Sequence, residues 1–180
     1  MTSNPIQLAI IIGSTREGRF APVVANWFTA QARQRDDLTV DVIDLAEPGL
    51  NASAMARRVE QAEAFVVITP EYNHSFPAPL KNAIDWHSKE WHAKPVGFVS
   101  YGGISGGLRA VEQLRQVFAE LHAVTVQRAV SFHGAWAYFD EQGQPKDPGS
   151  YGRRAKAMLD QLVWWARALR AARAERPYVA

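Results

Sequence analysis

Residues 6–19 read IQLAIIIGSTREGR, an apolar run that stops at a glycine and continues as a polar loop. A short aliphatic run with a single polar residue, Gln7, is typical of a strand that is buried on both faces. Such strands belong to parallel sheets that carry helices on both sides. We therefore expect a strand over Ile6–Ile12, whose carboxyl end opens into the loop of residues 13–19.

The same pattern recurs along the chain, where apolar runs alternate with segments of helical periodicity. The predicted strands are Ile6–Ile12, Leu38–Leu45, Ala64–Thr69, Val96–Tyr101 and Val124–Val130. The predicted helices are Arg19–Arg35, Asn51–Ala62, Ala78–Trp91, Ser105–Leu121 and Tyr151–Ala174, and residues 131–149 read as an irregular segment. Because this alternation implies right-handed crossovers, we expect one α/β domain over residues 1–180, with a mostly parallel sheet between two layers of helices.

The composition excludes several classes of protein. The 180 residues include no cysteine, which excludes disulfides, thiolate nucleophiles and iron–sulfur clusters. The five histidines lack metal-binding spacing, so we expect no metal. Basic residues gather near the C-terminus, but without a nucleic-acid motif they favour a solvated helix face and no nucleic-acid partner. No run of 18 apolar residues exists and residues 1–5 do not open a signal peptide, so we expect a cytoplasmic protein without membrane contact.

Ligands of open α/β sheets bind beyond the carboxyl ends of the strands, which makes the first predicted loop a candidate site. Residues 13–19 combine two glycines with hydroxyl and guanidinium donors, and a helix N-terminus follows them. Arg16 can grip two phosphate oxygens at once. The alternative is an ordinary polar turn. The loop lacks both the Gly-Lys-Ser/Thr of a Walker A loop and the G-x-G-x-x-G dinucleotide fingerprint.

Two further loops follow the third and fourth predicted strands. Residues 69–79 form a polar and aromatic loop bracketed by prolines, which can lay backbone N–H groups along the edge of a planar ring. Residues 101–107 hold four glycines, which allow a ligand to approach the backbone closely. The alternative is a flexible loop in which Ser105 caps the next helix. A phosphate cradle beside a flat slot suits FMN better than a plain nucleotide.

Three motifs at these positions resemble the NADPH-dependent FMN reductase family, which includes azo-dye, quinone and chromate reductases. The matching motifs are GSTR at residues 13–16, PEYNHS at 70–75 leading into PLKNAIDW at 79–86, and YGG with SGG at 101–107. The resemblance covers roughly residues 5–135 and is most specific in its middle motif. It implies a flavodoxin-like three-layer sandwich whose five parallel strands lie in the order 2-1-3-4-5.

The resemblance also implies an FMN site, with the phosphate at Ser14 and Arg16 and the ring between the second and third loops. The cofactor-binding residues expected on this basis are Ser14, Arg16, Arg19, Phe20, Pro70, Glu71, Tyr72, Asn73, Ser75, Tyr101, Gly102, Gly103, Ser105, Gly106 and Gly107. One departure concerns Arg19, which stands where many members carry a phosphate-binding serine. That contact can come from the guanidinium or from the backbone.

The family further implies a homodimer, often a dimer of dimers, that forms through the helix beginning at Pro79. We expect the same from the segment Pro79–Trp91, because its leucine, isoleucine and tryptophans offer more apolar surface than one sheet contact uses. His87 and His92, near the end of this predicted helix, are expected at the surface.

The predicted function is an NAD(P)H-dependent FMN or quinone reductase. It passes hydride from NADPH or NADH through bound FMN to a small acceptor, such as a quinone, free flavin, azo compound or metal oxyanion, by a ping-pong mechanism. We assign no catalytic side chain, and Glu71 is expected to be solvated or salt-bridged. A flavodoxin-like electron carrier remains an alternative, although the chain is not acidic. A receiver module is disfavoured, because the first strand ends without an acidic cluster. The acceptor, the choice of nucleotide, the dimer or tetramer state and the role of residues 131–149 stay open.

Overall fold

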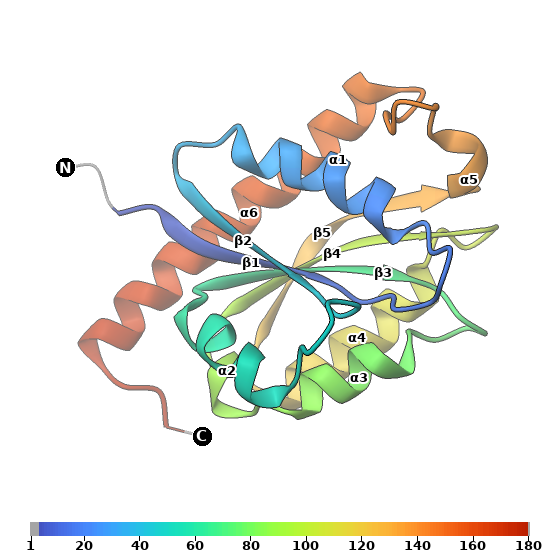
Figure 1. Cartoon of the computed structure of the whole chain (residues 1–180). Coiled ribbons are helices and arrows are strands. Elements are labelled where there is room, and N and C mark those ends of the chain that lie inside the picture. The colour runs from blue at the N-terminus through green and yellow to red at the C-terminus, as the bar shows by residue number, and fades with distance from the viewer. Residues whose placement is uncertain (1–3, 180) are drawn as a thin grey trace.

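The computed structural model describes residues 4–179 and has the predicted α/β architecture (Figure 1). The strands are β1 (Ile6–Ile12), β2 (Leu38–Asp44), β3 (Ala64–Pro70), β4 (Pro95–Gly102) and β5 (Val124–His133). The helices are α1 (Ala21–Arg33), α2 (Ala52–Gln61), α3 (Ala78–Asp85), α4 (Leu108–Glu120), α5 (Ala135–Tyr138) and α6 (Pro148–Glu175), with a 3-10 turn η1 (Lys89–Trp91).

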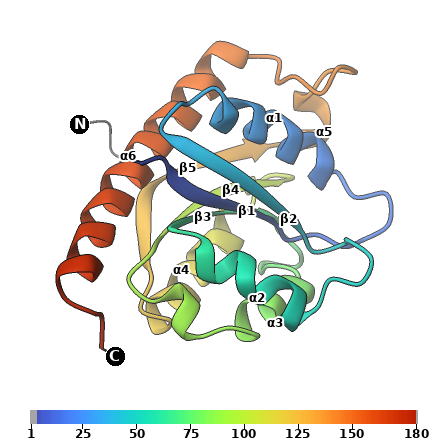
Figure 2. The ribbon, with the colours of Figure 1, turned by 60° about the vertical axis from the view of Figure 1, so that its left-hand side comes forward.

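All five strands are parallel and lie in the order β2-β1-β3-β4-β5, which confirms the predicted topology. Helices α1, α5 and α6 cover one face of the sheet, and α2, α3 and α4 cover the other (Figures 1 and 2). Each face therefore buries its own apolar cluster, and the sheet lies between them as the middle of three layers.

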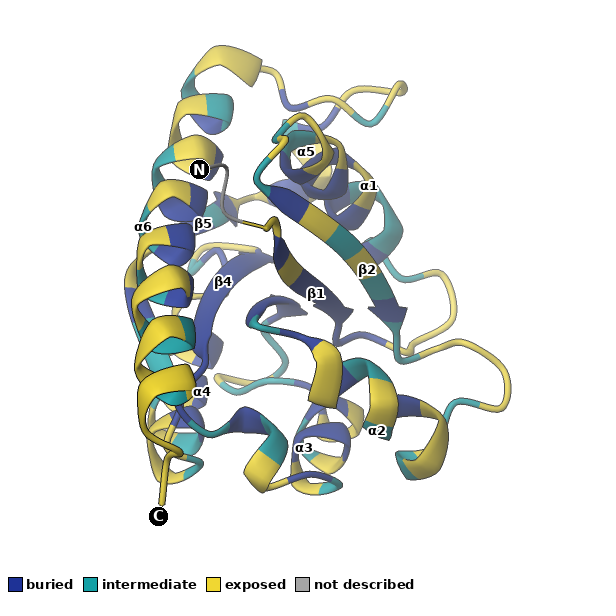
Figure 3. Ribbon diagram, turned by 90° about the vertical axis from the view of Figure 1, so that its left-hand side faces the viewer, coloured by how far each residue is buried: buried dark blue, intermediate teal, exposed yellow. Residues whose placement is uncertain are grey.

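Burial follows the position of each strand in the sheet. Strands β3 and β4 are buried at every residue, whereas the edge strand β2 mixes buried, half-buried and exposed positions (Figure 3). Polar residues of β2, such as Thr39 and Asp41, face solvent there. Because β3 and β4 are buried along their whole length and paired on both sides, the loops at their carboxyl ends are held on a rigid support.

The structure corrects the predicted bounds of several helices, and two of these differences have a clear physical cause. The segment predicted as a helix over Ala78–Trp91 breaks after Asp85 and resumes as η1. The Trp91 indole N–H donates to the Ile84 and His87 carbonyl oxygens at 3.1 and 3.0 Å, which satisfies groups that the helix end leaves free. Helix α4 begins at Leu108 and not at Ser105, because two preceding glycines have positive φ, a conformation outside the helical region.

Residues 131–149 contain more regular structure than the sequence indicated. Strand β5 continues to His133 and pairs with β4 up to Gly102, and the short helix α5 follows. The extension matters for function, because it brings the end of β5 to the same edge of the sheet as the predicted site.

The argument that Pro79–Trp91 offers an apolar surface for a dimer was wrong. Leu80, Ile84 and Trp91 are buried in this chain's own core, and Trp86 is half-buried. His87 is also buried, contrary to the expectation of a surface position, and its Nε2 has no hydrogen-bond partner in the described residues. Burial lowers the pKa of His87. The exposed positions of α3 are Ala78, Pro79, Asn82 and Asp85, which offer little apolar surface.

Within residues 4–179, no helix is both long and apolar enough to cross a membrane. In the same residues, no group of three or more histidine, aspartate or glutamate side chains is arranged to hold a metal ion.

Candidate functional site at the carboxyl edge of the sheet

Three loops meet at the carboxyl edge of the sheet, at the right of Figure 1. We call them loop 1 (residues 13–20, after β1), loop 2 (71–77, after β3) and loop 3 (103–107, after β4). The Ser14 hydroxyl lies 2.7 Å from the Tyr72 hydroxyl and joins loop 1 to loop 2. The Ser105 hydroxyl donates to the Glu71 carboxylate at 2.6 Å and joins loop 3 to loop 2. The structure therefore brings the three predicted loops together.

Loop 1 presents backbone donors that the chain does not use. Ser14 is fully buried, but Thr15, Arg16 and Glu17 are exposed, and their N–H groups meet no acceptor within residues 4–179. Helix α1 begins directly after the loop, with Pro22 in its first turn and no side chain capping its N-terminus. Free N–H groups at the positive end of a helix form a favourable site for a phosphate.

Arg19 supports loop 1 from within the protein. Its guanidinium donates to both oxygens of Asp44, at 2.5 and 2.6 Å, and to the Ser14 carbonyl oxygen at 2.5 Å. Burial alone would raise the pKa of Asp44, but the hydrogen bonds and charge of Arg19, with a bond from the Ala46 N–H, bring that pKa below its usual value. With both terminal nitrogens engaged, Arg19 ties loop 1 to the end of β2, a role that the sequence did not indicate.

Arg16 is placed differently. It is exposed, and its guanidinium lies over the Tyr72 ring, 4.3 Å from the ring centroid. A cation–π contact of this kind orients the side chain without using its hydrogen-bond donors. Arg16 therefore keeps its charge and its donors available beside the free N–H groups of loop 1.

Loop 2 turns back on itself within four residues. Tyr72 and Ser75 exchange two backbone hydrogen bonds, at 2.8 and 3.0 Å, and the two residues between them have positive φ, 51° at Asn73 and 69° at His74. Asparagine tolerates this left-handed conformation better than most residues. Gln113 of α4 holds the turn, since it accepts from the Ser75 hydroxyl at 2.5 Å and donates to the His74 carbonyl at 2.9 Å.

Loop 3 is shaped by two glycines with left-handed backbone. Gly106 and Gly107 have φ of 60° and 84°, and a Cβ at Gly107 would lie 2.7 Å from the Ser100 Cβ. The hydroxyls of Ser100 and Ser131 both donate to the Gly106 carbonyl oxygen at 2.8 Å. A Cβ at Gly103, by contrast, would meet nothing within 4 Å. Loop 3 is therefore packed tightly at its C-terminal half and open at its N-terminal half.

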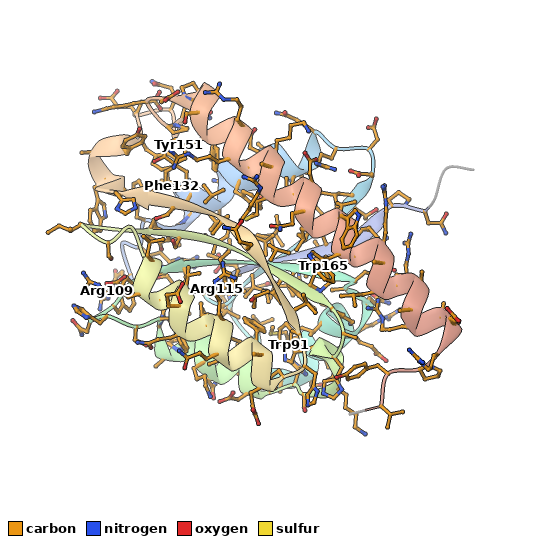
Figure 4. The ribbon with its side chains drawn as sticks, turned by 180° about the vertical axis from the view of Figure 1, so that it is seen from behind. Trp91, Arg109, Arg115, Phe132, Tyr151 and Trp165 are labelled. Atoms are coloured by element: carbon orange, nitrogen blue, oxygen red, sulfur yellow. The ribbon has the colours of Figure 1, made fainter. Side chains whose placement is uncertain are left out.

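Glu71 is the salt-bridged carboxylate that we expected as one of two cases. Its side chain is only 8% exposed and accepts from the Ser105 hydroxyl, the Arg109 N–H at 3.2 Å and the Arg109 guanidinium at 3.0 Å. Figure 4 shows Arg109 at this edge of the molecule, at the start of α4. Because its oxygens are occupied in this way, Glu71 links loops 2 and 3.

Aromatic rings form the floor behind loop 1. Tyr101 is buried, and its ring centroid lies 6.2 Å from that of Phe20, which in turn packs edge-on against Phe139 at 5.6 Å. Burial, with a smaller effect of Tyr72, raises the pKa of Tyr101, so its hydroxyl stays protonated. Pro70 and Gly102, the remaining predicted site residues, end β3 and β4 and are both buried.

Several residues at this edge were absent from the predicted site, among them Asp44, Arg109, Gln113, Ser131 and His133. Asp44 ends β2, so the rule that ligands bind at carboxyl ends of strands could have drawn attention to it. Ser131 and His133 fell in the segment read as irregular. For Gln113, on the surface of α4, the sequence carries no signal.

The residues present fit FMN. Exposed backbone donors of loop 1, which could hold a phosphate, lie beside the Arg16 guanidinium. A Cβ at Gly103 would meet nothing within 4 Å, and the neighbouring N–H groups of Ile104 and Ser105 have no acceptor in the described chain, so a flat ring could lie against them. The site is an open shelf. A hollow of about 630 Å³ lies elsewhere, between α1 and α6, where Arg35 is already paired with Asp37 and Asp160.

The fold defines a class, the flavodoxin-like α/β proteins. Flavodoxin 1 from Bacillus cereus superposes with a TM-score of 0.60 at 15% identity, covering 87% of this chain and 99% of that chain. FerB, described as a flavoenzyme NAD(P)H:(acceptor) oxidoreductase from Paracoccus denitrificans, superposes with a TM-score of 0.71 at 22% identity, covering 91% and 98%. At these identities the likeness concerns the fold alone.

The sequence then defines the family. Residues 6–137 match the model of the NADPH-dependent FMN reductase family, so the chain belongs to that family and the predicted resemblance is confirmed. The chain is 33% identical over 130 residues to an NAD(P)H-dependent FMN reductase of Schizosaccharomyces pombe, covering 62% of this chain and 64% of that protein. It is 34% identical over 143 residues to a quinone reductase of Escherichia coli, covering 70% and 76%.

Proposed function

We propose that this chain is an oxidoreductase that holds FMN on the shelf formed by loops 1, 2 and 3 and uses NADPH or NADH to reduce a small acceptor. The observation that carries the proposal is the set of backbone donors without acceptors at the carboxyl edge, with the charge of Arg16 beside them. Membership of the family and the names of the FMN and quinone reductase relatives support the same activity.

The residues divide into two parts of one site. The N–H groups of loop 1 and Arg16 would hold the phosphate, and Ser14, buried and bonded to the Tyr72 hydroxyl, would hold the loop in place. The ring would lie between the turn of loop 2 and the open half of loop 3, where Gly103 leaves room for it. When bound, FMN accepts a hydride from the pyridine nucleotide and passes the two electrons to the acceptor.

The chain's own contribution is to bind, orient and polarise. The N–H groups of loop 3 can stabilise negative charge that develops at the edge of the ring. No side chain is assigned as an acid or base, because hydride transfer through the flavin needs none and Glu71 is already paired with Arg109.

The visible absorption spectrum of the purified protein tests this proposal first. We expect a yellow protein with flavin absorbance, or a colourless protein that becomes yellow on incubation with FMN. A protein that stays colourless and shows no FMN binding by calorimetry would overturn the proposal.

The order of the two half-reactions tests the finer part, a ping-pong mechanism with a quinone as acceptor. We expect NADPH or NADH alone to bleach the bound flavin, and parallel double-reciprocal lines when quinone concentration is varied. A flavin that stays oxidised with both nucleotides, yet accepts electrons from a separate reductase protein, would show an electron carrier and not a reductase.

We also propose a homodimer, but through a different surface from the one first predicted. Ile104, Leu108 and Trp136 are 96%, 46% and 63% exposed and lie in or beside loop 3, whereas α3 has no such side chains. Light scattering at micromolar concentration would report a dimer, and a monomer would contradict this. The cytoplasmic location remains a prediction, which cell fractionation would test.

A further inference from the structure

Loop 3 is tied to the end of β5 by a set of short contacts around one imidazole. His133 Nδ1 lies 2.7 Å from the Ile104 carbonyl oxygen, and His133 Nε2 lies 3.2 Å from the Ser131 hydroxyl. The Gly134 N–H donates to the Gly103 carbonyl oxygen at 2.9 Å. Two carbonyls in the open half of loop 3 are therefore held from β5 and the turn that follows it.

The hydrogen atoms in this set can be assigned from the partners. A carbonyl oxygen only accepts, so Nδ1 of His133 carries the hydrogen and donates to Ile104. The Ser131 hydroxyl directs its single hydrogen to the Gly106 carbonyl oxygen at 2.8 Å. In the neutral ring Nε2 then carries no hydrogen, so its 3.2 Å approach to the Ser131 oxygen is a packing contact and not a hydrogen bond. His133 thus bridges the tip of loop 3 and the serine that holds the base of the same loop.

Close packing supports the same arrangement. A Cβ placed on Gly106 would lie 2.7 Å from Cδ2 of the His133 ring, so the ring rests directly on the glycine backbone. The left-handed φ of 60° at Gly106 is the conformation that a glycine allows and most residues resist. The ring, the glycine and Ser131 form one packed unit beneath the loop.

We infer that His133 is a positioning residue for the flavin site: it fixes loop 3 so that the N–H groups of Ile104 and Ser105 face the ring edge. The inference rests on the proposed function for its ligand. The contacts of His133 with loop 3 do not depend on that ligand. Because the Ile104 carbonyl and the Ser105 N–H belong to one planar peptide unit, holding the carbonyl also fixes the direction of the N–H. Glu71 holds the loop from the β3 side, and His133 holds it from the β5 side.

Three variants separate this role from a general contribution to folding. His133→Ala removes both ring contacts. His133→Asn retains a side-chain N–H near the position of Nδ1, so it can still donate to Ile104. His122→Ala is the matched control, because that exposed histidine contacts Tyr178 at the opposite edge of the sheet.

The first measurement is FMN affinity by calorimetry. We expect His133→Ala to raise the dissociation constant about tenfold, equivalent to about 1.4 kcal/mol. His133→Asn should restore most of the affinity, and His122→Ala should equal wild type. Wild-type affinity in His133→Ala, or no rescue by asparagine, would overturn the inference while leaving the proposed function intact.

The second measurement needs no flavin. Amide hydrogen exchange of the ligand-free protein reports on the N–H groups of Gly106, Gly107 and Leu108, which are bonded within loop 3. We expect exchange at these positions to be about tenfold faster in His133→Ala and near wild type in His133→Asn. Unchanged exchange in His133→Ala would contradict a positioning role, even if the wild-type protein bound no FMN.

Discussion

The two edges of the sheet differ in whether their hydrogen-bond donors have acceptors within the chain. At the amino edge, Lys94 is 8% exposed and its ammonium donates to the Val59 and Glu60 carbonyls, at 3.1 and 2.9 Å, where α2 ends. Arg173 beside it donates to the Ala93 carbonyl. At the carboxyl edge, several backbone N–H groups of loops 1 and 3 have no acceptor in the described chain. The Arg16 guanidinium there lies over the Tyr72 ring.

This difference shows that positive charge alone does not mark a binding site. Both edges carry cations and both lie against helix termini. The amino edge pairs its cations with backbone carbonyls, those of Lys94 at the negative end of α2, which satisfies donor and acceptor within the chain. The carboxyl edge leaves donors open while its supports, Arg19 and Glu71, are fully engaged. A ligand gains most where donors are held in place and remain free.

The largest expected effect comes from filling the closed half of loop 3. Gly107→Ala places a Cβ 2.7 Å from the Ser100 Cβ at a φ of 84°. Left-handed strain and overpacking together should lower the free energy of unfolding by roughly 4 kcal/mol. Urea denaturation measures this loss. A destabilisation of less than about 1 kcal/mol would mean that loop 3 is not packed as described.

The next effect tests the closed amino edge through pH. Burial, and then the charge of Arg173, lowers the pKa of Lys94 from 10.5 to about 8. Between these values the unfolded chain holds a proton that the folded chain has released, so stability rises with pH. Relative to Lys94→Met, wild type should gain about 3 kcal/mol from pH 8 to pH 10.5. Parallel stability curves for the two proteins would show that Lys94 is well solvated.

The two arginines of loop 1 allow a test of free against engaged donors, because Arg16 leaves its donors available and Arg19 is bonded to Asp44. Arg16→Ala should weaken FMN binding by about 1.5–3 kcal/mol and riboflavin binding much less, because riboflavin lacks the phosphate. Arg19→Ala should weaken both ligands similarly, since Arg19 acts by holding loop 1 to Asp44. Titration of each variant with both ligands measures this. Equal losses for the two ligands in Arg16→Ala would place its role elsewhere.

The smallest effect concerns the open half of loop 3. A Cβ at Gly103 meets nothing within 4 Å, so Gly103→Ala should change the free energy of unfolding by less than about 0.5 kcal/mol. If the flavin ring lies against this backbone, the same methyl group should weaken FMN binding by about 1 kcal/mol. Unchanged affinity would move the ring away from Gly103.

The sequence predicted those features of the structure that depend on a local run of residues. The apolar runs of β1, β3 and β4 predicted buried parallel strands, and the three loops after them were found by position. Pairing between side chains was not predictable. Nothing local says that Arg19 meets Asp44 or that Glu71 meets Arg109, because these partners come from distant segments that the fold brings together.

The errors have the same physical origin. The apolar residues between Leu80 and Trp91 suggested a second surface, because helical periodicity does not show where a helix breaks. In the fold, the break after Asp85 turns Trp91 back into the core, against Phe65 and Phe118. Likewise, the polar and aromatic residues after Val130 hid a continuing strand, whose pairing with β4 depends on a neighbour far away in sequence.

The position of α6 has a consequence for biosynthesis. This last helix packs against β5, β4, β3, β1 and α1, and it contributes Met158, Leu159 and Leu162 to one of the two cores (Figure 2). A ribosome releases residues 148–175 after all five strands have emerged. Until then, one face of the nascent sheet lacks its main cover and exposes aliphatic side chains. Completion of this domain therefore waits until α6 has left the ribosome, and the interval before it is when the growing domain most needs a chaperone.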